Sequence, residues 1–145
     1  MSTAVVRMGE SHIPSLCEIE RLCFPDPWSE NALREELENP AAHFLVLTVN
    51  GEAVAYLGSH HVGDEAYVTN VAVHPLHRQK GYAKTLLDTA KNEWQDIARI
   101  ALEVRVSNTP ARRLYETNGF VLDGIRPNFY RHPTEDAALY SFYRK

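Results

Sequence analysis

Several features that define large protein classes are missing from this sequence of 145 residues. No stretch approaches the roughly 20 apolar residues that a membrane-spanning helix needs, and residues 1–10 lack the apolar segment behind basic residues that marks a secretory signal. Lys and Arg number 15 against 19 Asp and Glu, a net charge of −4 at pH 7. The missing apolar stretches lead us to expect a cytoplasmic protein that binds no membrane. The negative net charge argues against nucleic acid as a partner and is compatible with a cationic peptide or amine.

Cysteine is scarce as well, with only Cys17 and Cys23 in the chain. Both fall in the first predicted helix, and two thiols without a secretory signal are normally reduced. The seven histidines have no HExxH motif or cysteine cluster beside them. We expect both cysteines to be core residues and no metal ion to be bound.

What the sequence does contain is the composition of one globular domain, which we assign to residues 1–145. Hydrophobic residues make up 44% and charged residues 23%. A chain of this length buries roughly 70% of the surface that it exposes when unfolded, which is enough for a sizeable core.

The most informative stretch joins an apolar strand, a basic loop and a helix start over residues 71–87. The strand stops at Pro75, and apolar residues recur at helical spacing from Ala83 onward. A helix N-terminus offers unpaired N–H groups and partial positive charge to an anion, and Gly81 lets a ligand approach the backbone closely. The residues predicted to hold a phosphate-bearing ligand are Arg78, Gln79, Lys80, Gly81, Tyr82, Ala83 and Lys84.

Two better-known phosphate loops do not fit, because the chain has neither G-x-x-x-x-G-K-S/T nor G-x-G-x-x-G at this place. What remains is R-x-x-G-x-A, from Arg78 to Ala83. A basic helix start with a capping turn would give the same pattern without any ligand. The pattern also resembles the acyl-CoA pyrophosphate loop of the GNAT superfamily of N-acetyltransferases, although Ala83 stands where many members have glycine. That resemblance implies acetyl-CoA as cosubstrate.

The order of the other elements predicts an α+β fold: a mixed, mostly antiparallel central sheet with helices on both faces. Asn50-Gly51 is a strong hairpin signal, and a crossover should place the strand after the third helix beside the strand ending at Val73. The order also matches the GNAT fold. The predicted strands cover residues 4–7, 43–49, 52–60, 66–73 and 100–106, and the predicted helices 13–24, 29–38, 81–95 and 109–118.

A rigid corner separates the first two predicted helices. Pro25 and Pro27 hold the chain extended, and Ser29 can cap the second helix. Trp28 then packs against Leu33 as a hydrophobic staple, which is a purely structural role. The corner also resembles the substrate-side loop of N-terminal acetyltransferases in the superfamily.

The strand over residues 100–106 alternates, so Glu103 and Arg105 face away from Leu102 and Val104. They could form a solvated face of the sheet. In an interior strand, however, both faces are normally covered, and an ionised carboxylate there needs a reason.

The helix that follows has signals at both ends: Thr109 can cap it, Pro110 suits its first position, and Asn118-Gly119 can end it. On this helix Tyr115 could be a core residue. The tract from Leu102 to Phe120 is nevertheless similar to RimI-type members of the superfamily, which acetylate the α-amine of a small-subunit ribosomal protein.

This resemblance covers nearly the whole chain and implies specific roles. Glu103 would accept a proton from the amine, and Tyr115 would donate one to the leaving thiolate. Pro127-Asn128-Phe129 departs from the basic residue and tyrosine that are common in relatives, which bears on peptide selectivity. Contacts to the pantetheine of CoA are implied for Val71, Ala72, Val73 and Asn108, and contacts to the acceptor for Trp28 and Tyr130.

The chemistry favours an N-terminal amine as acceptor. At pH 7 the neutral form of an α-amine with a pKa near 8 costs about 1 kcal/mol, whereas a lysine near 10.4 costs roughly 4.6 kcal/mol. Two alternatives stay open: an acetyltransferase for a small amine or a lysine side chain, and a non-catalytic CoA-binding or ribosome-associated module.

Overall fold

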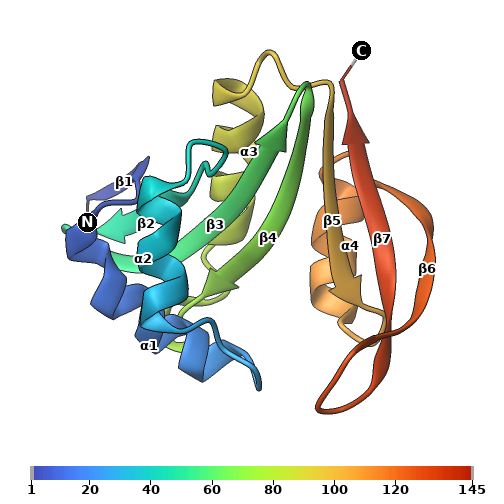
Figure 1. Ribbon diagram of the computed structural model, residues 1–145, viewed down its shortest axis with the longest axis horizontal. Helices are drawn as coiled ribbons and strands as arrows, with labels where there is room; N and C mark the ends of the chain where they lie inside the picture. The colour runs from blue at the N-terminus through green and yellow to red at the C-terminus, as the bar shows by residue number, and fades with distance from the viewer. Residues whose placement is uncertain (1, 145) are drawn as a thin grey trace.

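The computed structural model describes residues 2–144 and consists of one seven-stranded sheet with helices on both faces (Figure 1). The strand order is β1-β2-β3-β4-β5-β7-β6, and every neighbouring pair is antiparallel except β4 and β5. The α+β fold predicted from the sequence is therefore confirmed. The strands are β1 (Thr3–Arg7), β2 (Leu45–Val49), β3 (Glu52–Val62), β4 (Glu65–Val73), β5 (Arg99–Arg105), β6 (Val121–Tyr130) and β7 (Glu135–Tyr143), and the helices are α1 (Ile13–Cys23), α2 (Glu30–Glu38), α3 (Tyr82–Glu93) and α4 (Thr109–Thr117).

Local signals in the sequence set the turn between β2 and β3 and the start of α2. The hairpin turn has left-handed backbone at both central residues, with φ of 51° at Asn50 and 84° at Gly51, as an Asn-Gly turn requires. The Ser29 hydroxyl accepts a hydrogen bond from the backbone N–H of Ala32 at 3.0 Å and caps α2. Both predictions are confirmed.

The start of α4 differs from the prediction. Asn108, not Thr109, is its N-cap, and the Asn108 Oδ1 accepts from the backbone N–H of Ala111 at 3.2 Å. An asparagine caps a helix at least as well as a threonine, so the cap falls one residue earlier. At the other end the left-handed residue is Gly119, with φ of 89°.

Two apolar clusters cover the two faces of the sheet. The cluster under α3 and α4 contains Leu86, Leu87 and Tyr115. The cluster under α1 and α2 contains Leu16 and Leu33, and Trp28 packs against this cluster. Figure 1 shows these helix pairs on opposite sides of the sheet. We call the two sides the α3/α4 face and the α1/α2 face.

A β-bulge in β4 changes which side chains point to each face. The register with β3 shifts between Gly58, which pairs with Asn70, and Ser59, which pairs with Val68. The extra residue reverses the alternation. Val68 therefore packs in the cluster of the α3/α4 face, whereas Asn70 contacts Glu20 on the α1/α2 face.

Beyond the bulge β4 and β5 separate. Their parallel pairing covers only Glu65–Tyr67 of β4 and Arg99–Ala101 of β5, and the ribbons then diverge toward the lower edge of Figure 1. The prediction that β5 lies beside β4 is confirmed, because the two strands are paired at their starts. The ladder stops after three residue pairs, so the end of β4 at Val73 is not paired with β5.

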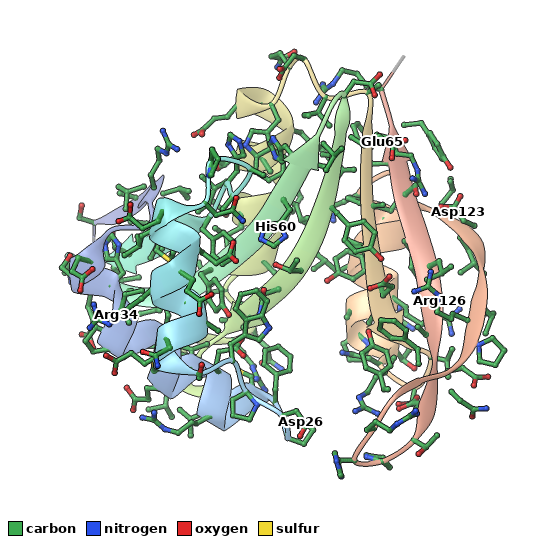
Figure 2. All side chains as sticks on the ribbon, in the orientation of Figure 1. Asp26, Arg34, His60, Glu65, Asp123 and Arg126 are labelled. Atoms are coloured by element: carbon green, nitrogen blue, oxygen red, sulfur yellow. The ribbon has the colours of Figure 1, made fainter. Side chains whose placement is uncertain are left out.

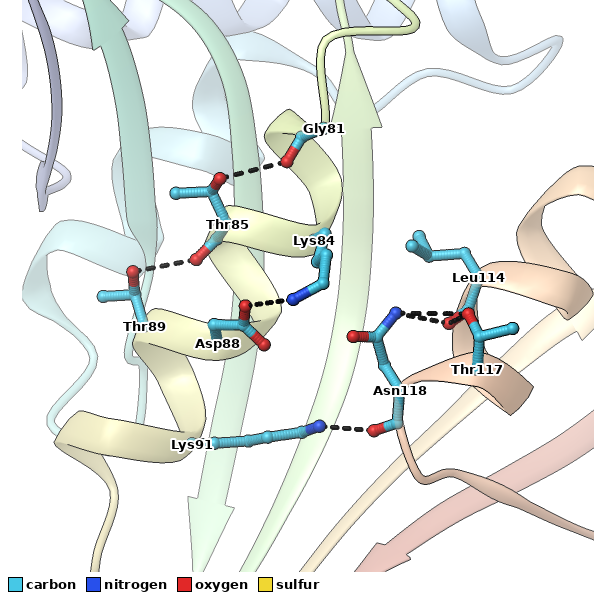
Figure 3. A network of polar contacts seen from close by, with 9 residues as sticks. All are labelled: Gly81, Lys84, Thr85, Asp88, Thr89, Lys91, Leu114, Thr117 and Asn118. Carbon is cyan, nitrogen blue, oxygen red and sulfur yellow. Dashed lines mark hydrogen bonds and ion pairs between the residues drawn. The ribbon is translucent and has the colours of Figure 1, made fainter.

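The far ends of α3 and α4 are tied together where the two strands are still paired. Lys91 donates a hydrogen bond to the backbone carbonyl of Asn118 (Figure 3). Arg144, just after β7, donates to the carbonyls of Lys91 at 2.9 Å and Trp94 at 3.1 Å. These bonds fasten the half of the sheet that carries α3 to the half that carries α4.

Within residues 2–144, no helix is long and apolar enough to cross a membrane. The same range holds no group of three or more His, Cys, Asp or Glu side chains placed to bind a metal ion.

We predict that a stack of two histidines makes the fold sensitive to acid. The rings of His43 and His61 stack with centroids 3.7 Å apart, next to Trp94. Burial lowers the pKa of His61 to about 4, with His43 adding to the effect and Asp96 opposing it. Because an unfolded histidine titrates near 6.5, the unfolded chain binds more protons, and stability should fall as pH drops from about 6.5 through 4.

Urea unfolding between pH 7 and pH 4 measures this loss. His61→Phe keeps a ring in the stack but cannot take up a proton, so its stability should fall less steeply over the same range. Equal slopes for the two proteins would contradict the assignment to His61.

Candidate functional site

The gap between the diverging strands holds a cleft of about 450 Å³. Its walls come from β4, β5, the end of α1, the corner before α2, the start of α4 and the end of β6. In Figure 2, Asp26 lies on the corner before α2, which forms part of the cleft wall, and Arg126 lies on the other half of the sheet, on β6. The sequence-predicted residues that line the cleft are Trp28, Val71, Glu103, Asn108, Tyr115 and Tyr130.

Glu103 faces this cleft and is not part of a solvated sheet face. Its side chain is only 13% exposed, and the Arg126 Nη1 lies 3.6 Å from its Oε1. The Tyr67 hydroxyl donates a hydrogen bond to the same oxygen. Burial raises the pKa of Glu103, and the nearby Arg126 guanidinium opposes that rise. A carboxylate with a raised pKa is a better proton acceptor than an ordinary glutamate.

Neither Tyr67 nor Arg126 was singled out in the sequence as a partner of Glu103. Tyr67 comes from the neighbouring strand β4, and Arg126 comes from β6. The spacing of charges along the sequence gives no sign of these contacts, because they depend on the pairing of β4 with β5 and on the order β5-β7-β6.

Tyr115 is both a core residue and a wall of the cleft. Only 6% of the residue is exposed, and its ring packs 5.7 Å from Phe120 and 6.1 Å from Tyr140, measured between centroids. Burial raises the pKa of Tyr115 above its ordinary value. The phenol therefore keeps its proton at neutral pH and can act as a proton donor.

Tyr130 is held against the cleft by Arg105. The Arg105 guanidinium lies 4.6 Å from the centroid of the Tyr130 ring and donates to the carbonyls of Arg131 and Pro133, both at 2.8 Å. Burial, with Glu103 adding to it, raises the pKa of Tyr130 to about 12. Arg105, which lies on the same side of β5 as Glu103, thus orders the connection between β6 and β7.

A buried polar cluster lies in the wall of the cleft on the α1/α2 face. The Glu20 carboxylate accepts from the Trp28 backbone N–H at 2.8 Å, from the Tyr56 hydroxyl at 2.5 Å and from the Asn70 amide at 3.3 Å. Sequence reasoning assigned none of these roles. The available signal was Glu20 itself, a carboxylate on the apolar side of the first predicted helix.

The predicted phosphate loop follows the C-terminal end of β4, the end that is separated from β5, and residues 78–84 are not among those that line the cleft. Its backbone is left-handed at Gln79, with φ of 64°, and at Gly81, with φ of 77°. Gly81 is the N-cap of α3, and a Cβ built on it would meet no atom within 4 Å. The open space around this helix N-terminus fits an anionic group such as a pyrophosphate.

Two of the predicted cationic ligands bond to the protein itself. Lys84 pairs with Asp88 one turn along α3, at 2.7 Å (Figure 3). Arg78 donates from Nε to the Val73 carbonyl at 3.1 Å and from Nη2 to the Cys23 Sγ at 3.2 Å. Cys17 is buried in the core as expected, whereas Cys23 is only half-buried: it packs against the cluster of the α1/α2 face and also lines the cleft.

The last residues of β4, just before the loop, pack on alternate faces of the sheet. Val71 and Val73 pack against the cluster of the α3/α4 face, and Ala72 is buried in the cluster of the α1/α2 face. Only the backbone of these residues can serve a ligand that lies along the free edge of β4. The backbone N–H and carbonyl groups on that edge beyond Tyr67 are not paired with β5.

Comparison with known proteins gives a consistent result. The model of the acetyltransferase (GNAT) family matches residues 13–120. A ribosomal protein bS18-alanine N-acetyltransferase from Haemophilus ducreyi is 37% identical over 141 residues, which covers 92% of this chain and 95% of that protein. The protein of the same name from Escherichia coli K12 is 36% identical over 126 residues, covering 86% and 83%.

Solved structures agree with the sequence comparison. The crystal structure of the ribosomal-protein-S18-alanine N-acetyltransferase from Escherichia coli superposes with a TM-score of 0.91 at 30% identity, covering 98% of this chain and 94% of that one. More distant structures of the same fold were solved with acetyl-CoA or coenzyme A bound.

We predict that Arg126→Gln raises the pKa of Glu103 further, because it removes the one cation that opposes the effect of burial. NMR titration of the glutamate side-chain carboxyl carbons measures this value directly. The matched control is Arg131→Gln, which removes a guanidinium from the wall of the same cleft without touching Glu103. The prediction fails if the two variants leave the titration of Glu103 equally unchanged.

Proposed function

The chain belongs to the GNAT family of acetyltransferases, and we propose that it acetylates the α-amine of a protein N-terminus, the N-terminal alanine of ribosomal protein bS18. Like other members of the family, it is an acetyl-CoA-dependent N-acetyltransferase. The observation that carries the proposal is one cleft that holds a carboxylate with a raised pKa and a protonated phenol. The names of relatives at 36–37% identity support the choice of acceptor.

The two candidate catalytic groups approach the cleft from opposite faces of the sheet. Glu103 alternates with Leu102 and Val104, which pack in the cluster of the α3/α4 face, so its own side chain is on the α1/α2 face with Trp28. Tyr115 belongs to the α3/α4 face. We assign the α1/α2 face to the acceptor and the α3/α4 face to acetyl-CoA, because the α3 N-terminus is on that side.

The cosubstrate has a continuous track in this assignment. The N-terminus of α3 and Gly81 would hold the pyrophosphate, and the loop residues 78–84 would surround it. The free edge of β4 at residues 71–73 would bond the pantetheine, with Asn108 as a further polar contact. Since the Val73 carbonyl already accepts from Arg78, Val71 is the better backbone acceptor for the pantetheine in this arrangement.

The reaction requires one proton to leave the amine and one to reach the thiolate. Glu103 takes a proton from the α-ammonium group and so frees the lone pair with which the nitrogen forms the bond to the thioester carbon, and the proton that the nitrogen loses as the amide forms passes to solvent. Tyr115 gives its proton to the sulfur as the carbon–sulfur bond breaks. After the step Glu103 is protonated and Tyr115 is deprotonated, so each group must exchange a proton with solvent before the next turnover.

The first test concerns the acceptor. A peptide with a free N-terminal alanine should be acetylated at its α-amine, because the neutral amine is far more accessible there than on lysine. The same peptide with a blocked N-terminus and an internal lysine should react poorly. Mass spectrometry of both peptides after incubation with acetyl-CoA gives the result, and a preference for the lysine or for a small free amine would refute the assignment.

The second test concerns Glu103. General-base assistance contributes typically 10²- to 10⁴-fold, so Glu103→Gln, which keeps the size and polarity of the side chain, should lower kcat at neutral pH by about 10²-fold or more. Raising the pH toward 9 supplies neutral amine from solution. The variant should then recover part of its rate relative to the wild type.

Tyr115→Phe is the matched control for that pH profile. It preserves the ring packing against Phe120 and Tyr140 and removes only the proton donor. Its kcat should fall with acetyl-CoA affinity intact, and higher pH should not restore it. Wild-type turnover in both variants would exclude the pair from the chemistry.

A further inference from the structure

One polar atom on the α1/α2 face of the cleft has no partner among the described residues. It is the Oδ1 of Asn70, a residue that is 6% exposed and lines the cleft. A buried oxygen without a hydrogen bond costs roughly 1–3 kcal/mol. A small apolar residue at this position of β4 would avoid this cost. We therefore look for a hydrogen-bond donor to the Asn70 Oδ1 outside the fold.

The orientation of the amide is determined by its neighbour. Glu20 is 1% exposed, and its carboxylate can only accept hydrogen bonds, so the Asn70 NH₂ must face it, as the 3.3 Å contact shows. The Oδ1 is then held on the other side of the amide. Because the NH₂ group donates to an anion, the amide is polarised and its oxygen becomes a stronger acceptor.

The charge behind this amide is uncompensated. Glu20 accepts hydrogen bonds only from neutral groups, the Trp28 N–H, the Tyr56 hydroxyl and the Asn70 amide, and within residues 2–144 it forms no ion pair. A buried carboxylate without a cation makes the local potential negative. The position therefore favours a donor that is cationic or electron-poor.

The bulge places this atom on the acceptor side. Without the reversal of alternation at the bulge, Asn70 would point with Val68 into the α3/α4 cluster. With it, Asn70 shares a face with Glu103 and with Trp28, whose backbone N–H bonds to the same Glu20 carboxylate.

We infer that Asn70 is the residue that binds and orients the terminal nitrogen of the acceptor, through a hydrogen bond from an N–H of that nitrogen to Oδ1. This inference rests on the proposed function. A neutral α-amine has two N–H bonds and one lone pair, and the lone pair must point at the thioester carbon. With one N–H held by Asn70 and the other directed to Glu103, the lone pair has a single direction left. Asn70 is thus a specificity-determining residue that takes up no proton.

The experiment compares two variants that each remove one hydrogen bond from Glu20. Asn70→Leu is close in size to the native residue and also removes Oδ1, whereas Tyr56→Phe leaves Oδ1 in place. For an N-terminal alanine peptide, Asn70→Leu should raise KM by about 10-fold or more, the usual range for a lost bond to a charged or polarised group. The Kd of acetyl-CoA should stay unchanged. Tyr56→Phe should alter the peptide KM much less.

A second measurement uses the wild-type protein and does not depend on the folding of a variant. The side-chain amide signals of Asn70 in NMR spectra should shift when the alanine peptide is added to the CoA-bound enzyme. They should not shift with an analogue in which a hydrogen replaces the terminal amine.

The outcomes separate this inference from the proposed function. If the wild type acetylates no peptide N-terminus, the proposed function fails. If it does so and Asn70→Leu and Tyr56→Phe behave alike, or both peptides shift the Asn70 signals equally, only the role of Asn70 is refuted. A raised Kd for acetyl-CoA in Asn70→Leu with an unchanged peptide KM would assign Oδ1 to the cosubstrate and overturn the inference.

Discussion

The structure depends on the early end of the hydrogen-bond ladder between β4 and β5. Two parallel strands that stayed paired would fill the centre of the sheet and leave no room for a ligand. Here only residues 65–67 and 99–101 are paired, and the freed backbone of β4 beyond that point can be satisfied by bound groups. The cleft, the largely buried carboxylate of Glu103 and the access to Tyr115 all follow from this separation.

The bulge in β4 assigns side chains to the two sides of the cleft. A strand without it would send Val68 and Asn70 to the same face. The one extra residue keeps Val68 in the apolar core and moves Asn70 next to Glu20. A local irregularity of the backbone thus determines which side chains face the α1/α2 side of the cleft and which face the α3/α4 side.

Most of the fold was predictable from the sequence, because its signals are local: the Asn50-Gly51 turn, the Ser29 cap and the glycine that starts α3. The strands β6 and β7 were not predicted as a pair, since Gly124 and Pro127 interrupt the alternation of β6 and register shifts follow it. For the site, the alternation of side chains along β5 was enough to show that Glu103 faces away from Leu102. Its contacts with Tyr67 and Arg126, and the Glu20 cluster, depend on which strands become neighbours.

The bonds from Lys91 to Asn118 and from Arg144 to the end of α3 lie at the paired end of the two strands. The two halves of the sheet are therefore joined at one end of the β4–β5 pair and separate at the other. A rotation of a few degrees at the joint changes the spacing of Trp28 and Tyr130 at the tips far more than that of Glu65 and Arg99. The width of the cleft at these tips is therefore set by the orientation of the two halves of the sheet rather than by the local structure of either wall.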